Sequence, residues 1–215
     1  MTASNRRSRQ KSDRRSQLLA AAEQLFAERG FLAVRLEDIG AVAGVSGPAI
    51  YRHFAGKEHL LVELLTEVSA RLLEGGQSVV AQAPDAHAAL AGLIEFHLDF
   101  ALTEPDLIRI QDRDLANLPG SAQRQVRRAQ RRYVEIWVGA LHQVKPGVDE
   151  DRARIMAHAA FGLINSTPHS VRPTRTASPA QSRAVLRSMT TAALGLPDKT
   201  WAEQDPRRRR SVGSR

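Results

Sequence analysis

The sequence predicts an all-α protein, and three observations support this. Apolar residues recur at the three- and four-residue spacing of a buried helix face along almost the whole chain. Aromatic residues make up only 5% of the 215 residues, while alanine, leucine, arginine and glutamine are abundant, a composition that favours helices over a β-sandwich or barrel. Prolines and glycines interrupt the apolar pattern and divide the chain into about nine helices.

Each helix is predicted from its start and stop signals. The first lies between Ser12-Asp13, which are typical of a helix start, and Gly30, which is typical of a helix end. Further helices are expected over residues 36–43, 47–53 and 57–74, then after Pro84, Pro105, Pro119-Gly120 and Pro146-Gly147, and finally over residues 178–196. Ser178 begins the last helix as an N-cap, with Pro179 and Gln181 in the positions of a capping box.

Residues 36–61, LEDIGAVAGVSGPAIYRHFAGKEHLL, form the most informative stretch of the chain. Gly44 tolerates the positive φ of a tight turn between two short helices. Ser46 is a good N-cap for the second helix, and Pro48 fits its first turn. This pattern predicts a helix-turn-helix whose recognition helix spans residues 47–53.

Residues 12–65 resemble the TetR family of bacterial repressors. The pattern AAEQLFAERGF (21–31) and, most specifically, YRHFAGKEHLL (51–61) carry this resemblance. It implies an N-terminal three-helix helix-turn-helix domain that holds palindromic operator DNA, and a C-terminal helical domain that dimerises and binds a small molecule. Ligand binding would then release the DNA. Activators share this fold, so repression is expected from the majority of the family.

The expected domains follow from this resemblance and from the distribution of charge. They are a disordered basic arm (1–11), the helix-turn-helix domain (12–56), the ligand-binding and dimerisation domain (57–197) and a disordered basic tail (198–215). The net charge is +8, and the excess lies in the arm and tail, which indicates a polyanionic partner. We expect the arm to follow the minor groove or phosphates of DNA. Solvated tails without a partner are the alternative.

The resemblance implies DNA contacts around the recognition helix. Tyr51 and His53 would reach phosphates, and Lys57 would stand at the start of the fourth helix near another. Many family members have Ser or Thr where this chain has Arg35, and that hydroxyl caps the second helix. Arg35 cannot act as this cap, but its positive charge could pair directly with a phosphate. A packing role for Tyr51 and a solvated Lys57 are the alternatives. The predicted DNA-binding residues are Arg35, Ser46, Gly47, Pro48, Ala49, Tyr51, Arg52, His53 and Lys57.

The resemblance also implies a dimer seam on the last two helices and an inducer pocket in the middle helices. The seam would use small and apolar residues such as Ile155, Val185 and Met189, and an intramolecular core is the alternative. The candidate ligand-binding residues are His97, Phe100, Arg109, Arg113, Trp137, His158, Phe161 and Asn165. An aromatic lining with polar anchors would suit an apolar or anionic metabolite such as an acyl-coenzyme A, whereas the same residues could serve packing or an amphipathic surface.

Other classes of protein are disfavoured by what the sequence lacks. There is no cysteine, which excludes disulfides and thiolate chemistry. Neither metalloprotease nor hydrolase nor nucleotide-binding motifs occur, so no enzyme activity, cofactor or metal is expected. A protein that coats DNA non-specifically through basic tails is the remaining alternative. Without a signal peptide or a long apolar run, we expect a cytoplasmic protein with no membrane partner.

Overall fold

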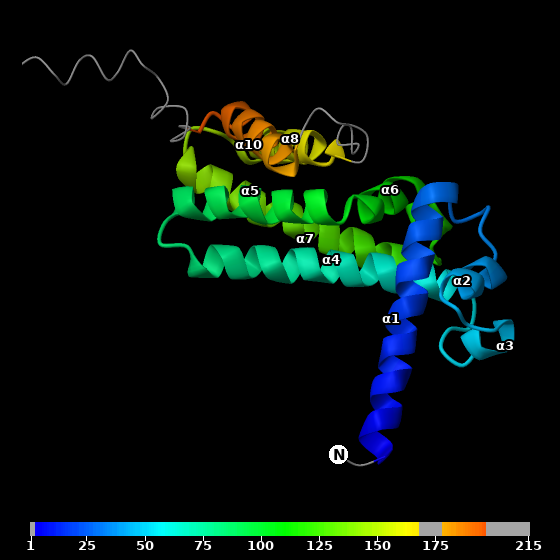
Figure 1. Cartoon of the computed structure of the whole chain (residues 1–215). Coiled ribbons are helices and arrows are strands. Elements are labelled where there is room, and N and C mark those ends of the chain that lie inside the picture. Colours follow the sequence, from blue (N-terminus) through cyan, green and yellow to red (C-terminus); the bar gives the residue numbers. More distant parts are fainter. Residues whose placement is uncertain (1–2, 168–177, 197–215) are drawn as a thin grey trace, which may run out of the picture. The chain divides into compact units, whose positions relative to one another are not determined.

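A computed structural model describes residues 3–167 and 178–196, and every regular element in these ranges is helical (Figure 1). The predicted all-α fold is thus confirmed. The elements are α1 (Ala3–Arg29), α2 (Leu36–Val42), α3 (Gly47–Ile50), α4 (Lys57–Gln82), α5 (Ala86–Thr103), α6 (Pro105–Asp114), the 3-10 turn η1 (Leu115–Asn117), α7 (Gly120–Val144), α8 (Glu150–Ile164) and α10 (Pro179–Ala193). No helix in the described ranges is long and apolar enough to cross a bilayer.

The chain forms two compact units, each built from two segments. The first contains residues 1–75 and 104–133, and the second contains residues 76–103 and 134–215. Helices α4 and α7 each supply residues to both units, since the divisions fall inside these helices. The boundary after residue 56, between the predicted helix-turn-helix and ligand-binding domains, is a division by function and stays a prediction beside this division into compact units.

In the first unit, α1 packs against α2 and α6, and α2 packs against α3. The apolar face of α1 supplies Leu18, Leu25 and Phe26 to a core that also contains Ile39 and Phe54. Phe54 is only 2% exposed, and its ring is part of this core. Burial of these side chains stabilises the unit by about 1.5–3 kcal/mol for each large apolar residue.

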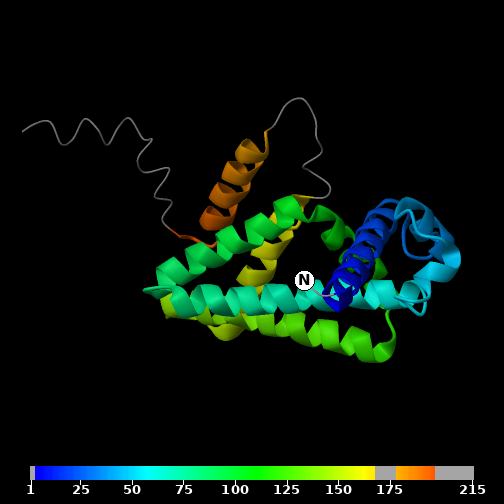
Figure 2. The same cartoon turned by 60° about the horizontal axis from the view of Figure 1, so that its bottom comes forward.

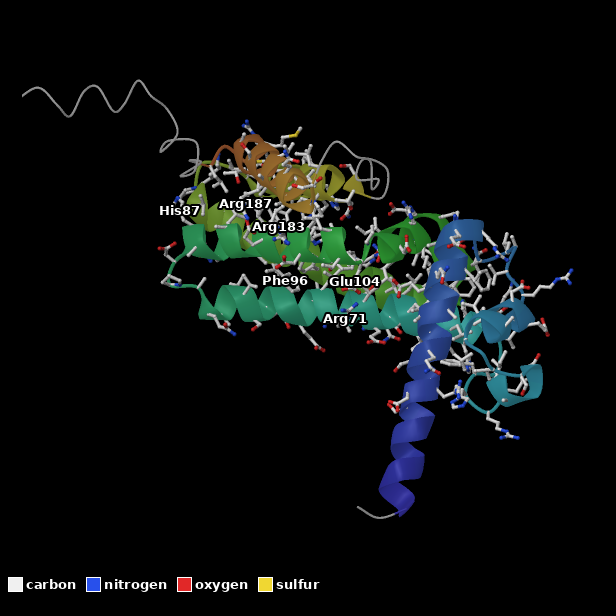
Figure 3. The ribbon with its side chains drawn as sticks, viewed as in Figure 1. Arg71, His87, Phe96, Glu104, Arg183 and Arg187 are labelled. Carbon is white, nitrogen blue, oxygen red and sulfur yellow. The ribbon has the colours of Figure 1, made fainter. Side chains whose placement is uncertain are left out.

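In the second unit, α10 packs against α5 and α8, as Figures 1 and 2 show from two directions. Leu93 and Leu98 of α5, Trp137 of α7 and Ala157 of α8 are fully buried in its core. Arg187 of α10 donates from Nη2 to Glu95 Oε2 at 2.8 Å, and Arg183 pairs with Glu95 and Asp99. Figure 3 labels the two arginines between α10 and α5. These ion pairs hold α10 against α5.

Some helix ends differ from their predicted positions. Helix α4 continues through Gly75-Gly76 to Gln82, because glycine inside a helix costs only about 1 kcal/mol and the flanking residues favour helix. Helix α1 already begins at Ala3, so residues 3–11 extend a helix that the sequence places from Ser12 onward. Helix α3 ends at Ile50, and residues 51–53 form a turn. The loop over 168–177 and the tail over 198–215 lie outside the described residues.

Candidate nucleic-acid interface and ligand site

Two glycines determine the geometry of the helix-turn-helix. Gly44 has φ +64°, the left-handed conformation predicted for the turn, which side chains with a Cβ atom adopt at a cost. At Gly40, an added Cβ would meet the Val45 carbonyl oxygen at 2.8 Å and Ile50 Cδ1 at 2.5 Å. The turn and α3 therefore approach α2 more closely than any residue other than glycine would allow at position 40.

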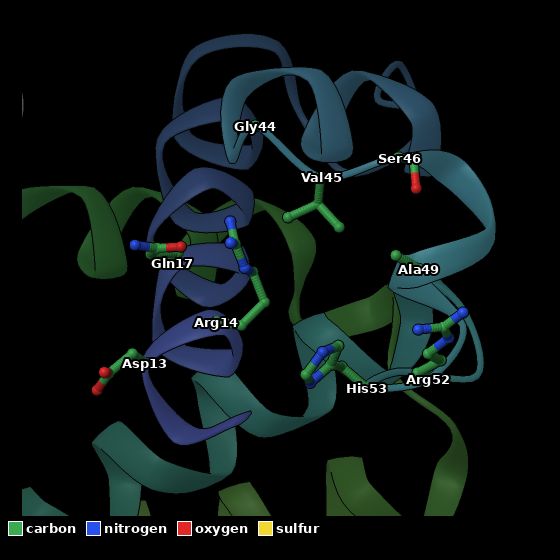
Figure 4. A pocket seen from close by; sticks show the side chains of 9 residues that line it. All are labelled: Asp13, Arg14, Gln17, Gly44, Val45, Ser46, Ala49, Arg52 and His53. Atoms are coloured by element: carbon green, nitrogen blue, oxygen red, sulfur yellow. The ribbon is translucent and has the colours of Figure 1, made fainter. Parts of the chain in front are cut away.

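An open groove of about 880 Å³ lies between α1 and the helix-turn-helix (Figure 4). Its walls are Asp13, Arg14 and Gln17 of α1, together with Gly44, Val45, Ser46, Ala49, Arg52 and His53. The guanidinium groups of Arg14 and Arg52 come from opposite walls (Figure 4), and the carboxylate among the lining groups is that of Asp13. Four of the nine predicted DNA-binding residues, Ser46, Ala49, Arg52 and His53, thus share one concave surface with Arg14.

The other predicted DNA-binding residues lie around this groove. Tyr51 is 60% exposed, which argues against a buried packing ring. Gly47 and Pro48 form the first turn of α3, after the N-cap Ser46, whose exposed hydroxyl makes no capping bond to the described backbone of α3. Arg35 is exposed at the N-cap of α2, where its backbone N–H donates to Asp38 Oδ2 at 2.9 Å. The Asp38 carboxylate thus accepts from the backbone N–H of the N-cap residue, while the Arg35 side chain, which has no acceptor atom, cannot cap the helix.

Lys57 has a structural role in addition to its position at the start of α4. Its Nζ atom donates to the carbonyl oxygens of Phe31 at 2.8 Å and Val34 at 2.9 Å, with Leu32 O at 3.3 Å. It also lies 4.5 Å from the centroid of the Phe31 ring. The α1–α2 connection thus occupies the donors of the Lys57 ammonium group, which argues against the alternative of a solvated side chain, and the contact with phosphate stays a prediction.

Arg15, which the sequence places beside the basic arm, is likewise used inside the first unit. Its Nε donates to Glu63 Oε1 at 2.9 Å, its Nη1 donates to the His53 carbonyl oxygen at 2.9 Å, and the guanidinium lies 4.3 Å from the Phe54 ring centroid. It joins α1 to the segment that connects α3 to α4. Arg14, one residue earlier, points into the groove instead.

Six of the eight candidate ligand-binding residues gather in the second unit. His97 is 3% exposed, and its Nε2 lies 3.0 Å from Asn165 Oδ1. The Phe161 ring centroid is 4.9 Å from those of both His97 and Trp137. Phe100 and His158 complete the cluster, at 5.8 Å from His97 and 6.4 Å from Phe161. We call these six residues the aromatic cluster.

The electrostatics of the aromatic cluster follow from its burial. Burial lowers the pKa of His97 to about 4, and the hydrogen bond to Asn165 acts in the opposite direction. The imidazole is therefore neutral at pH 7, with an Nε2–H that donates to the amide oxygen. The cluster is a mainly aromatic environment in which the buried His97 pairs with the half-buried Asn165, and aromatic side chains with a few polar groups are the usual composition of a small-molecule site.

Arg109 and Arg113 do not belong to the aromatic cluster, because both lie in the first unit. Arg109 pairs with Asp106 at 2.6 Å. Arg113 donates to the carbonyl oxygens of Phe26 and Ala27 in the last turn of α1, and to Asp114 Oδ2 at 3.1 Å. The sequence does not predict this connection between α1 and α6. The segment LIRIQDRDL (107–115) shows charged residues beside apolar ones, but this pattern does not indicate which distant backbone atoms they contact.

Taken together, these features define a helix-turn-helix DNA-binding protein with a helical second unit that contains an aromatic cluster. The chain belongs to the tetR family of bacterial regulatory proteins. Residues 18–64 match the family "Bacterial regulatory proteins, tetR family", and residues 83–193 match the "Tetracyclin repressor-like, C-terminal domain". It is a DNA-binding transcriptional regulator and not an enzyme, as the sequence predicted.

Individual relatives and solved structures agree with this assignment. The repressor KstR2 of Mycobacterium tuberculosis is 30% identical over 86% of this chain and 94% of its own length. KstR2 of Rhodococcus jostii is 29% identical over 73% of this chain and 77% of its own. A TetR-family regulator from Bordetella parapertussis superposes with a TM-score of 0.76 at 22% identity, covering 85% and 94% of the two chains. AibR in complex with isovaleryl coenzyme A and operator DNA superposes with a TM-score of 0.70 at 17% identity, covering 82% and 97%.

Proposed function

We propose that this protein is a homodimeric repressor that releases a palindromic operator when a small ligand, such as an acyl-coenzyme A, occupies its second unit. The observation that carries the proposal is the aromatic cluster around the buried His97 and its partner Asn165, in a chain whose other unit presents a helix-turn-helix. The named function of the KstR2 relatives supports repression. The complex of AibR with isovaleryl coenzyme A supports an acyl-coenzyme A as the ligand class.

The DNA is proposed to bind along the groove between α1 and the helix-turn-helix. Arg14 and Arg52 would neutralise phosphates on the two walls of that groove. Gly47, Pro48 and Ala49 lack polar side-chain atoms, so at these positions bases would be read through close backbone approach and thymine methyl contacts. Tyr51, Ser46, Arg35 and His53 would add phosphate contacts, while the ammonium group of Lys57 holds the α1–α2 connection.

A dimer is proposed because α8 and α10 leave large apolar side chains exposed. Ile155 is 70% exposed, Val185 56% and Met189 50%. A soluble chain seldom exposes several such side chains on neighbouring helices unless another molecule covers them. A second copy would bury them in a four-helix seam and would pair two recognition helices on the half-sites of a palindrome.

The first experiment selects binding sites from a random duplex library and then titrates the selected duplex and a scrambled control. We expect an inverted repeat that is bound at least about a thousandfold more tightly than the control. The variant Val185→Lys/Met189→Lys should sediment as a monomer and lose this preference. Equal affinity for both duplexes would instead assign binding to the basic segments alone and would overturn the proposal.

The second experiment tests the ligand with the tryptophan of the aromatic cluster. In a Trp201→Phe background the fluorescence comes from Trp137, which is fully buried. Titration with isovaleryl coenzyme A and with longer acyl-coenzyme A esters should change this signal and lower operator affinity over the same concentrations. Phe161→Ala should weaken both effects in parallel. A ligand that changes the fluorescence while leaving operator affinity unchanged would contradict the release mechanism.

A further inference from the structure

The first half of α7 carries an unusual concentration of positive charge. Five exposed arginines fall within nine residues: Arg124, Arg127, Arg128, Arg131 and Arg132. Residues 120–134 contain no Asp or Glu, and the first carboxylate of the helix is that of Glu135. The ion pairs found among the described residues all use other arginines, so none of them includes one of these five. We call these five residues the arginine face.

The arginine face lies opposite the side of α7 that packs into the first unit. Ala122, Val126 and Tyr133 are buried, and at about 100° per residue they share one side of the helix. The five arginines fall on the other side at the same spacing. Because the apolar side of the helix is already buried in protein, α7 has no free apolar face to insert into a membrane surface, as amphipathic membrane helices do.

Local energetics give no structural reason for this arrangement. Arg127 and Arg131, like Arg128 and Arg132, are four residues apart on the helix surface, where like charges repel each other. The face also lies in the N-terminal half of α7, toward the positive end of the helix dipole. Charges that are unfavourable for the isolated helix become favourable when an anionic partner neutralises them.

We propose that the arginine face binds phosphates of duplex DNA outside the base pairs that the helix-turn-helix reads. This rests on the DNA binding of the regulator. From Arg124 to Arg132 the helix rises about 12 Å, a length that fits a row of phosphates better than a single small anion. The hollow beside Ser121, Arg124, Gln125 and Arg128 measures about 240 Å³, below the roughly 300–1,000 Å³ of small-molecule sites. An arginine fork also matches phosphate oxygens in pairs.

The test compares R128Q/R131Q with R29Q/R152Q, which removes the same charge from exposed arginines elsewhere. Affinity is measured for a duplex of about 60 base pairs that contains the selected operator and for a scrambled duplex of equal length, over a range of salt concentrations. R128Q/R131Q should lose the same factor of affinity for both duplexes, with a salt slope lower by about 0.9 for each phosphate that the variant no longer neutralises. The control variant should keep the wild-type slope.

Further readouts keep the result unambiguous. R128K/R131K retains the charge and should restore most of the salt slope, and thermal unfolding should show that all variants fold. If R128Q/R131Q matches the control in affinity and slope, the proposal is overturned. A loss confined to binding of coenzyme A or of anionic vesicles would overturn it as well. The operator-to-scrambled ratio of the wild type reports separately on the proposed repressor function, which can stand or fall without the arginine face.

Discussion

The Nε2 atom of His97 lies 3.0 Å from the Oδ1 atom of Asn165, and this contact joins the middle of α5 to the C-cap of α8. The imidazole is almost completely buried, and rings of Phe161 and Trp137 lie beside it. A buried neutral histidine of this kind links the stability of the second unit to pH, because the unfolded chain binds a proton that the folded chain excludes.

The first prediction concerns this linkage. The pKa of His97 is lowered to about 4 from 6.5, chiefly by burial, so between these values the unfolded state holds the extra proton. The free energy of unfolding should therefore fall as the pH decreases from 6.5 toward 4, by up to about 3 kcal/mol from this residue. Urea unfolding at pH 7 and pH 4.5 should give a larger decrease for the wild type than for His97→Gln. His158→Gln, at an exposed position, serves as control and should keep the wild-type decrease.

Gly40→Ala should damage the helix-turn-helix directly. The new methyl group would lie 2.8 Å from the Val45 carbonyl oxygen, so the turn or α3 must move, at a cost of about 1–3 kcal/mol. We expect lower thermal stability and weaker operator binding. The control is Gly139→Ala in α7, where the added Cβ would meet nothing within 4 Å beyond the chain neighbours and backbone of its own helix; it should stabilise by up to about 1 kcal/mol. Equal stability of the two variants would refute the close packing at Gly40.

Lys57 and Arg52 should show opposite phenotypes. Lys57→Met removes the donor to three carbonyl oxygens and should lower the free energy of unfolding by about 1–3 kcal/mol, with the salt slope of DNA binding unchanged. Arg52→Gln changes an exposed residue of the groove, and should lower that slope by about 0.9 for each phosphate left without its cation, with stability unchanged. Chemical unfolding and a salt titration of operator affinity separate the two. A lower slope for Lys57→Met would restore the phosphate role that the sequence suggested.

Arg113 and Asp114 are predicted to act as a pair. Asp114 is only 4% exposed, whereas Arg113 is 44% exposed and donates both to Asp114 and to the last turn of α1. Arg113→Gln should destabilise the protein because it leaves a buried carboxylate without its cation. A double-mutant cycle with Asp114→Asn, measured by urea unfolding, should give a coupling free energy of about 0.5–3 kcal/mol. Additive single effects would show that the two side chains act independently.

The helices and the helix-turn-helix could be predicted because their signals are local. The periodic apolar residues, the capping box at Ser178 and the turn at Gly44 each act through neighbours within a few positions. Helix ends were less predictable, since residues 3–11 and the pair Gly75-Gly76 tolerate helix without favouring an end there. The sequence by itself thus determined the fold class and the family of this protein.

Only the tertiary structure decided what the long polar side chains do. Lys57 bonds to carbonyl oxygens more than twenty residues away, and Arg113 to some that are 86 and 87 residues away. Such partners depend on how helices pack, which no local pattern encodes. For the same reason, six of the candidate ligand-binding residues meet around His97, whereas Arg109 and Arg113 belong to the first unit. The long side chains of lysine and arginine are flexible, so they donate to the acceptor atoms that the packed helices bring close to them. Their partners are therefore determined by the packing of the core.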